Sequence, residues 1–313
     1  MKSCQSLRIV FMGTPEFAVA SLDALQKAGC NIVAVVTAPD KPAGRGMKMT
    51  ESAVKKYAVE NSIPVLQPEK LKHPDFLETL RSLKADLQIV VAFRMLPELV
   101  WNMPPMGTVN LHGSLLPQYR GAAPINWAVI NGEQETGVTT FKLQHEIDTG
   151  NILLQERFRI AENETAGEVH DRMKEIGAQL LVKTVMGLSA NTIVESPQQQ
   201  FDLSDLKHAP KIFTETCKID FQKTNVEVHN LIRGLSPFPG AFTYLKEKTL
   251  KIYRSEKVDA SIMKLSVSPG EWITDQKTYL YYACSNGWIA VKELQWEGKK
   301  RMGIDEFLRG FRP

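Results

Sequence analysis

The chain has 313 residues, of which 43% are hydrophobic and 23% charged, so it is long enough for two domains and has the composition of an ordinary globular protein. It contains no apolar run of about 18 residues, which predicts no membrane span, and its polar start predicts no signal peptide. The four cysteines are scattered without metal-ligand spacing, which predicts no metal site and indicates a reduced, cytoplasmic setting.

The charge is unevenly distributed along the chain. Residues 1–205 carry 20 Lys/Arg and 23 Asp/Glu, a net charge of −3, whereas residues 206–313 carry 18 and 12, a net charge of +6. A basic C-terminal third suits a polyanion such as nucleic acid, although a solvated lysine-rich surface would give the same count.

The first half of the chain alternates strand-like and helix-like stretches. Short Val/Ile runs between stretches of helical spacing predict a mostly parallel sheet with helices on both faces. The expected strands are Leu7–Met12, Asn31–Thr37, Pro64–Leu66, Leu87–Phe93, Thr108–His112 and Gly137–Leu143, with an edge hairpin at Ile152–Ile160. The expected helices are Phe17–Ala28, Val54–Asn61, Phe76–Leu83 and Thr165–Leu188.

A polar, helix-poor stretch at residues 190–208 predicts a linker between a first domain, 1–189, and a second, 209–313. After the linker, Val226–Arg233 has helical spacing, and short β-rich segments with glycine turns predict a small barrel. These segments are Ala241–Leu245, Thr249–Ser255, Tyr279–Ala283 and Trp288–Gln295. The predicted fold class is therefore α/β, with a mostly parallel sheet followed by a small β-barrel.

Two loops stand out in the first domain. Gly13–Glu16 follows the first strand and opens a helix, so it is either an anion-binding helix start or a simple turn; it lacks the G-x-G-x-x-G pattern of dinucleotide sites. The loop at residues 37–49 holds two prolines, two glycines and three basic residues, more than a turn needs. Its Arg45 and Lys48 suit contacts to phosphates, and a mobile, solvated loop is the alternative.

The segment around Asn110 and His112 is the most informative part of the chain. The two polar residues alternate with apolar ones, so on a strand both side chains point to one face. Gly113, Ser114 and Pro117 then force a turn. An amide and an imidazole beside such a turn can polarise a carbonyl and move a proton, which we interpret as an active site rather than a core strand.

Asp148 supplies a carboxylate in the same half of the chain, within Asp-Thr-Gly. As a turn residue it would need no function, and the sequence does not establish that it meets His112. His145 and Glu146 beside it offer a second acid–base pair. The other histidines, His170, His208 and His229, are unaccompanied in sequence, so we expect them to be structural or exposed.

At these residues the chain resembles the folate-dependent formyltransferases, a likeness that covers nearly the whole chain. The stretch Asn110–Pro117 together with Asp148 is similar to their active-site signature. Three further segments resemble the members that act on a charged tRNA. They are Phe11–Phe17, the loop Pro39–Met49 and the junction Leu235–Gly240.

This resemblance implies a Rossmann-like catalytic domain and an OB-like C-terminal barrel that helps to hold tRNA. The implied reaction transfers the formyl group of 10-formyltetrahydrofolate to the methionine amino group on initiator methionyl-tRNA, in a monomer without metal. Formyl transfer to a small amine, such as a nucleotide or an amino sugar, and hydrolysis of the formyl donor are alternatives with the same signature. A nucleic-acid-binding module on an inert domain is a third reading.

The resemblance also assigns roles to residues. The implied catalytic residues are Asn110, His112 and Asp148. The residues expected to line the folate are Ser114, Leu115, Leu116, Pro117, Phe93, Arg94 and Met95. The residues expected to bind tRNA are Lys41, Arg45 and Lys48.

Overall fold

The computed structural model describes residues 4–43, 48–198, 206–262 and 267–311, and the chain forms two compact units. The first unit consists of Met1–Arg120, Gly137–Arg157 and Asp171–Lys207. The second consists of Gly121–Thr136, Phe158–His170 and His208–Pro313. Within the described ranges, no helix is long and apolar enough to cross a membrane.

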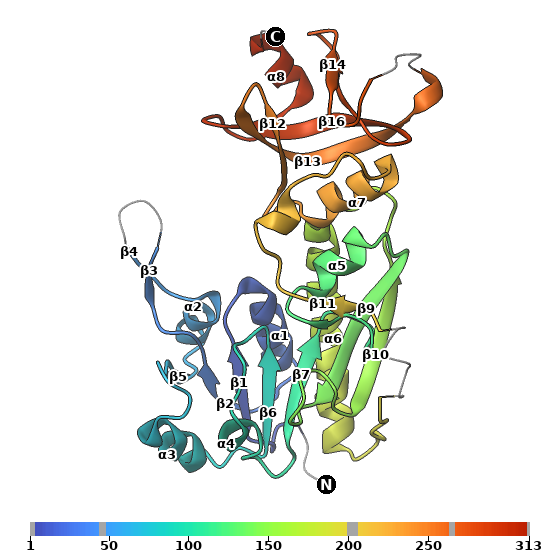
Figure 1. The fold of residues 1–313 in the computed structure, drawn as a ribbon. Coiled ribbons are helices and arrows are strands. Elements are labelled where there is room, and N and C mark those ends of the chain that lie inside the picture. Colours follow the sequence, from blue (N-terminus) through green and yellow to red (C-terminus); the bar gives the residue numbers. More distant parts are fainter. Residues whose placement is uncertain (1–3, 44–47, 199–205, 263–266, 312–313) are drawn as a thin grey trace. The chain divides into compact units, whose positions relative to one another are not determined.

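A seven-stranded sheet with the order β10-β9-β7-β6-β1-β2-β5 organises the first unit (Figure 1). Its strands are β1 (Ile9–Gly13), β2 (Ile32–Val36), β5 (Val65–Leu66), β6 (Leu87–Val91), β7 (Thr108–His112), β9 (Glu135–Lys142) and β10 (Ile152–Arg159). The pairs β1–β2, β2–β5, β1–β6 and β6–β7 are parallel, and β9 runs antiparallel to β7. This arrangement confirms the predicted Rossmann-like sheet, including the edge position of β10.

The chain reverses its direction of travel across the sheet next to β1. It adds β2 and β5 on one side of β1 and then crosses to β6 and β7 on the other side. In doubly wound sheets, ligands bind beyond the carboxyl ends of the strands near such a switch point. The ends of β1, β6 and β7 are therefore the expected location of a site.

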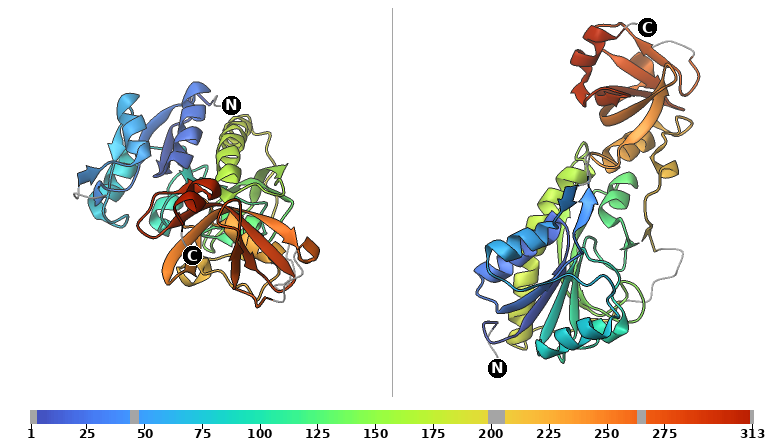
Figure 2. Two further views of the ribbon diagram at one scale, coloured as in Figure 1. Left: turned by 90° about the horizontal axis from the view of Figure 1, so that it is seen from above. Right: turned by 90° about the vertical axis from the view of Figure 1, so that its left-hand side faces the viewer.

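Helices cover both faces of this sheet (Figure 2). Their bounds are α1 (Glu16–Lys27), α2 (Ala53–Glu60), α3 (Pro74–Ser82), α4 (Glu98–Trp101) and α6 (Ala166–Ser189). On one face, Phe76 of α3 and Val100 of α4 share an apolar cluster with Val10 and Val90 of the sheet. On the other face α1 packs so closely that a Cβ at Gly13 would lie 2.6 Å from the Cβ of Ala18, which explains the glycine at the end of β1.

Where the sequence predicts a long loop, the structure forms a small hairpin. Strands β3 (Lys41–Ala43) and β4 (Lys48–Thr50) pair antiparallel. Each strand has three residues, which is too short for an alternating hydrophobic pattern, so the sequence could not show these strands. The four residues between the two strands, 44–47, lie outside the described part of the chain.

The second unit contains an antiparallel sheet with the order β12-β13-β16-β15-β14, with β17 paired to β16. Its strands are β12 (Ala241–Leu245), β13 (Lys248–Asp259), β14 (Trp272–Thr274), β15 (Leu280–Ala283), β16 (Gly287–Trp296) and β17 (Met302–Gly303). Its helices are α5 (Pro124–Ile130), α7 (Asn225–Gly234) and α8 (Ile304–Gly310), with single turns η2 (Glu215–Cys217) and η3 (Ala260–Ile262). The two-residue strands β8 (Arg120–Gly121) and β11 (His208–Ala209) pair separately.

A single apolar core holds this sheet together. Tyr282 and Phe311 are fully buried in it, and Ile232 of α7 and Leu308 of α8 close it. Helix α7 begins with a complete capping box between Thr224 and Glu227, which satisfies two otherwise unpaired backbone N–H groups. The predicted small barrel of β-strands is confirmed, although the short elements β14 and α8 were not expected.

Candidate active site

Strand β7 places an amide and an imidazole on the same side of the sheet. Apolar Val109 and Leu111 are buried against one face, and Asn110 and His112 point to the other, as the alternation predicts. His112 is 7% exposed, and Asn110 is half-buried. Among the described residues, no group forms a hydrogen bond with the Asn110 side chain, so its NH₂ is available to a ligand.

The two ring nitrogens of His112 have different partners. Nε2 lies 2.9 Å from the carbonyl oxygen of Tyr119, and because a carbonyl only accepts, Nε2 is the donor. Nδ1 lies 3.8 Å from Oδ2 of Asp148, longer than a hydrogen bond but within ion-pair distance for a protonated ring. The Phe141 ring, edge-on at 6.5 Å, packs against the imidazole. The structure thus brings His112 and Asp148 together, which the sequence alone could not establish.

Asp148 is held by its backbone rather than by a regular element. It is 9% exposed, and its φ of +55° lies in the left-handed region. Gln198 donates to the carbonyl oxygens of Asp148 at 2.8 Å and of Gly150 at 2.9 Å, and Arg120 holds the Gln198 side chain. A Cβ at Gly150 would lie 1.6 Å from the carbonyl oxygen of Lys142, so this turn requires glycine.

The turn after β7 is fixed by a buried network around Thr139, which lies opposite His112 on β9. The Thr139 hydroxyl donates to the Ser114 carbonyl at 2.7 Å and accepts from the Leu116 N–H at 3.1 Å. Gln155 donates to the same hydroxyl and to the Leu116 carbonyl. The Ser114 hydroxyl donates to the Gln118 carbonyl at 2.6 Å. The segment following His112 is therefore preorganised before any ligand binds.

Several of these groups were missed by the sequence reasoning. The Tyr119 carbonyl is a backbone group and carries no side-chain signal, and Thr139 and Gln155 look like ordinary strand residues. Gln198 lies within the polar stretch interpreted as a linker. No local pattern identifies these groups, because each one forms its hydrogen bond with a residue that only the fold brings close.

The residues expected to line the folate lie at two places. In the turn after β7, Ser114 and Leu116 are buried, and Leu115 and Pro117 are half-buried. The other group, Phe93, Arg94 and Met95, follows β6. Because β6 and β7 are parallel neighbours, both groups lie at the carboxyl edge of the sheet.

The segment after β6 is tied to the chain that follows β5. The Arg94 guanidinium donates to the carbonyl oxygens of Pro68 and Glu69 and lies 5.7 Å from the Phe93 ring centroid. Met95 is 75% exposed. Arg94 and Met95 border a pocket of 550 Å³, which is lined by residues 69–72 and 94–99 and by neither His112 nor Asp148. The candidate reacting groups therefore lie outside this pocket.

The expected tRNA contacts are on or near the β3–β4 hairpin. Lys41 is exposed at the start of β3, and Lys48 begins β4. Arg45 lies outside the described residues. The suggested second acid–base pair is not brought to this site as a pair: His145 Nε2 lies 3.0 Å from Glu98 Oε2, and both His145 and Glu146 are exposed.

Comparison with known proteins decides the family. A formyl transferase family model matches residues 7–185, and a formyl transferase C-terminal domain model matches residues 211–312. The chain belongs to the formyl transferase family. Within this family it is 51% identical to a protein of Bacteroides fragilis, over 98% of this chain and 96% of that one. It is 54% identical to one of Parabacteroides distasonis, over 98% and 97%. Both relatives are named methionyl-tRNA formyltransferase.

Solved structures support the formyl transferase fold. A sugar 3N-formyl transferase crystallised with dTDP and 5-N-formyl-THF superposes with a TM-score of 0.67 at 20% identity, over 94% of this chain and 99% of that one. At this identity the likeness shows the fold alone. In the part of the chain that the structure describes, no cluster of three His, Cys, Asp or Glu side chains could hold a metal ion.

Proposed function

We propose that this formyl transferase moves the formyl group of 10-formyltetrahydrofolate to the amino group of methionine on initiator tRNA. The names of the full-length relatives at 51% and 54% identity support this acceptor. One observation carries the chemistry. His112 Nδ1 lies 3.8 Å from Asp148 Oδ2, beside the sheet face that also presents Asn110.

The first task of these residues is to stabilise negative charge. Attack of the uncharged amine on the formyl carbon places that charge on the formyl oxygen. The NH₂ of Asn110 has no partner among the described residues and can donate to this oxygen, and His112 with both ring nitrogens protonated would be the second donor through Nδ1–H, since Nε2–H already donates to the Tyr119 carbonyl. Loss of one such donor typically raises the barrier by about 3–4 kcal/mol, a factor on the order of 10²–10³ in rate.

The second task is to move one proton. As the new C–N bond forms, the amine loses a proton, and the bond to the folate nitrogen breaks as that nitrogen gains one. The Asp148 carboxylate would accept this proton and return it to the folate nitrogen, directly or through a water. Nε2 of His112 is already engaged with the Tyr119 carbonyl, so Nδ1 is the nitrogen that faces Asp148 and the reaction.

We assign the holding of the two substrates to separate segments. The turn Ser114–Pro117 and the segment Phe93–Met95 follow neighbouring strands and would bind the formyl donor. Lys41, Arg45 and Lys48 would contact the tRNA, and the +6 charge of residues 206–313 would add attraction to phosphates. We propose a monomer that works in the cytoplasm.

An assay with three acceptors tests this function. We expect the enzyme to formylate methionine-charged initiator tRNA, to act weakly on charged elongator tRNA and to leave the formyl donor intact without tRNA. Product on an amino sugar or a nucleotide amine, with none on tRNA, would overturn the proposed acceptor. Full activity of a variant with Asn110, His112 and Asp148 all changed to Ala would overturn the assigned chemistry.

A further inference from the structure

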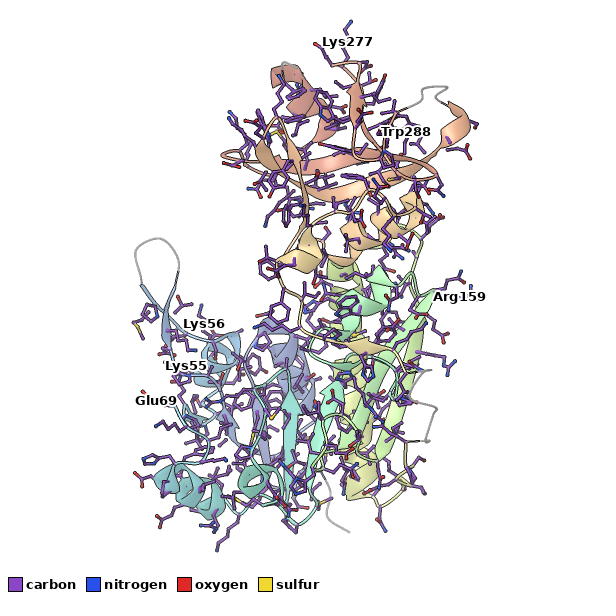
Figure 3. The ribbon with its side chains drawn as sticks, viewed as in Figure 1. Lys55, Lys56, Glu69, Arg159, Lys277 and Trp288 are labelled. Carbon is purple, nitrogen blue, oxygen red and sulfur yellow. The ribbon has the colours of Figure 1, made fainter. Side chains whose placement is uncertain are left out.

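A single lysine, Lys55 (labelled in Figure 3), contacts the residues at both ends of the β3–β4 hairpin. Asp40 directly precedes β3, and Glu51 directly follows β4. The ammonium of Lys55, in the first turn of α2, lies 2.5 Å from Asp40 Oδ2 and 2.9 Å from Glu51 Oε1. One charged group therefore contacts the residues that flank both strands of the hairpin. We call these three residues the Lys55 clamp.

The clamp is anchored to the parallel sheet. Gln67, which follows β5, donates to Asp40 at 2.7 Å and to the Ala38 carbonyl at 2.9 Å. Ser52 caps the start of α2 by accepting from the Lys55 N–H at 3.0 Å, and its hydroxyl lies 2.7 Å from that of Thr37, which follows β2. The residues that flank the hairpin are thus hydrogen-bonded to residues that follow β2 and β5.

The clamp carries one positive and two negative charges, so the Lys55 ammonium is more than neutralised by its partners. Hydrogen bonding to Asp40 raises the pKa of Lys55, and hydrogen bonding from Lys55 lowers the pKa of Asp40. The side chain of Lys55 is only 18% exposed and has two carboxylates as partners, so it is poorly placed to bind a phosphate. Its neighbour Lys56 is exposed and has no ion-pair partner among the described residues.

We propose that Lys55 is a positioning residue for the acceptor substrate. By joining Asp40 and Glu51, it sets the direction in which the hairpin leaves the sheet, and thereby the place of the basic residues that the hairpin carries. This inference rests on the proposed use of the hairpin to bind charged tRNA. It assigns Lys55 no contact with either substrate.

A plain electrostatic role and a positioning role predict opposite results. If these residues acted only through attraction to phosphates, Lys55→Met and Lys56→Met would weaken tRNA use equally, and Asp40→Asn, which removes a negative charge, would improve it. If the clamp positions the hairpin, Lys55→Met and Asp40→Asn both impair tRNA use and Lys56→Met does not.

The experiment measures steady-state kinetics of the full-length protein with charged initiator tRNA and with 10-formyltetrahydrofolate. For Lys55→Met and Asp40→Asn, we expect the KM for the tRNA to rise about tenfold, as for the loss of a charge-assisted contact, with kcat and the folate KM changed less than about twofold. Lys55→Arg should restore most of the tRNA KM, because a guanidinium can reach both carboxylates. The melting temperature of each variant confirms that it folds.

Two results would overturn the inference. One is an equal tRNA KM for Lys55→Met and Lys56→Met; the other is a lower tRNA KM for Asp40→Asn than for the wild type. Both are distinct from failure of the proposed function, in which the wild type itself would not formylate the tRNA.

Discussion

Each unit of the molecule buries one histidine deeply, and the two differ in their surroundings. His112 in the first unit is 7% exposed, and His229 in the second is 2% exposed. The His112 ring meets a backbone carbonyl and a carboxylate. His229 on α7 lies 3.0 Å from the Ser255 hydroxyl through Nδ1.

The charges around the two rings differ in sign. Burial, followed by the positive charges of Arg233 and Lys257, lowers the pKa of His229 to about 4, so this ring is neutral at pH 7. His112 instead has the acidic Asp148 beside Nδ1. Depth of burial therefore does not separate a candidate catalytic histidine from a structural one. The dominant neighbouring charge differs between the two: Arg233 and Lys257 outweigh Glu162 at His229, whereas Asp148 lies beside His112.

Replacing each histidine in turn tests most directly whether the two differ in function. We expect His112→Ala to lower kcat/KM for formyl transfer by on the order of 10³, because it removes both a proposed oxyanion donor and the neighbour of Asp148. His229→Gln, the matched control, should stay within about threefold of the wild type, because it touches no proposed substrate site. The measurement is transfer to charged initiator tRNA. Comparable losses in the two variants would contradict the distinction.

Removing only the negative charge beside His112 tests the role of the Asp148 carboxylate. Asp148→Asn keeps the shape of the side chain but loses the proposed acceptor for the amine proton. We expect kcat to fall on the order of 10²-fold with little change in either KM. Circular dichroism serves as the control for folding. An unchanged kcat would exclude Asp148 from the proton transfer.

The pH dependence of stability tests the second histidine. Because the pKa of His229 is lower in the folded protein, the neutral ring contributes stability that is fully present above pH 6.5 and is lost as the pH falls toward 4. The loss amounts to about 3 kcal/mol when complete. Urea unfolding at pH 7 and pH 4.5 should show a smaller decrease for His229→Gln than for the wild type. Equal decreases would show that another group is responsible.

The smallest expected effect concerns the turn beneath His112. Thr139→Val removes a hydroxyl that donates to Ser114 and accepts from Leu116 and Gln155. We expect a loss of about 1–3 kcal/mol in the free energy of unfolding, because buried polar groups lose their partner. Denaturant titration gives this value, and Thr140→Val, one residue along β9, provides a comparison. A neutral Thr139→Val would show that this hydroxyl does not hold the turn.

The sequence predicted those parts of the fold and the candidate site that depend on local pattern. The run Thr108–His112 is the strand β7 as expected, because alternation and the turn after Gly113 are readable over a few residues. The strand predicted at Ala241–Leu245 has the same bounds as β12. The hairpin strands β3 and β4 were not predicted, because each is only three residues long.

What the sequence could not provide is proximity between distant segments. β9 runs antiparallel to β7, so its last residue, Lys142, lies opposite Val109 near the start of β7, and it is the segment between β9 and β10 that brings Asp148 within 3.8 Å of His112 Nδ1. Likewise, nothing local marks Gln198 as a partner of the Asp148 backbone or Lys55 as a bond between Asp40 and Glu51. These contacts arise from topology, which periodicity does not encode.

The bond from Gln198 to the backbone of Asp148 has a practical consequence for dividing the chain. A catalytic fragment ended at residue 189, where the last helix of the first half stops, would keep all three candidate catalytic side chains and yet lose this brace. The turn that carries Asp148 would then lose two hydrogen bonds to its backbone. A shortened enzyme should retain residues through 198 to keep the Asp148 carboxylate in position.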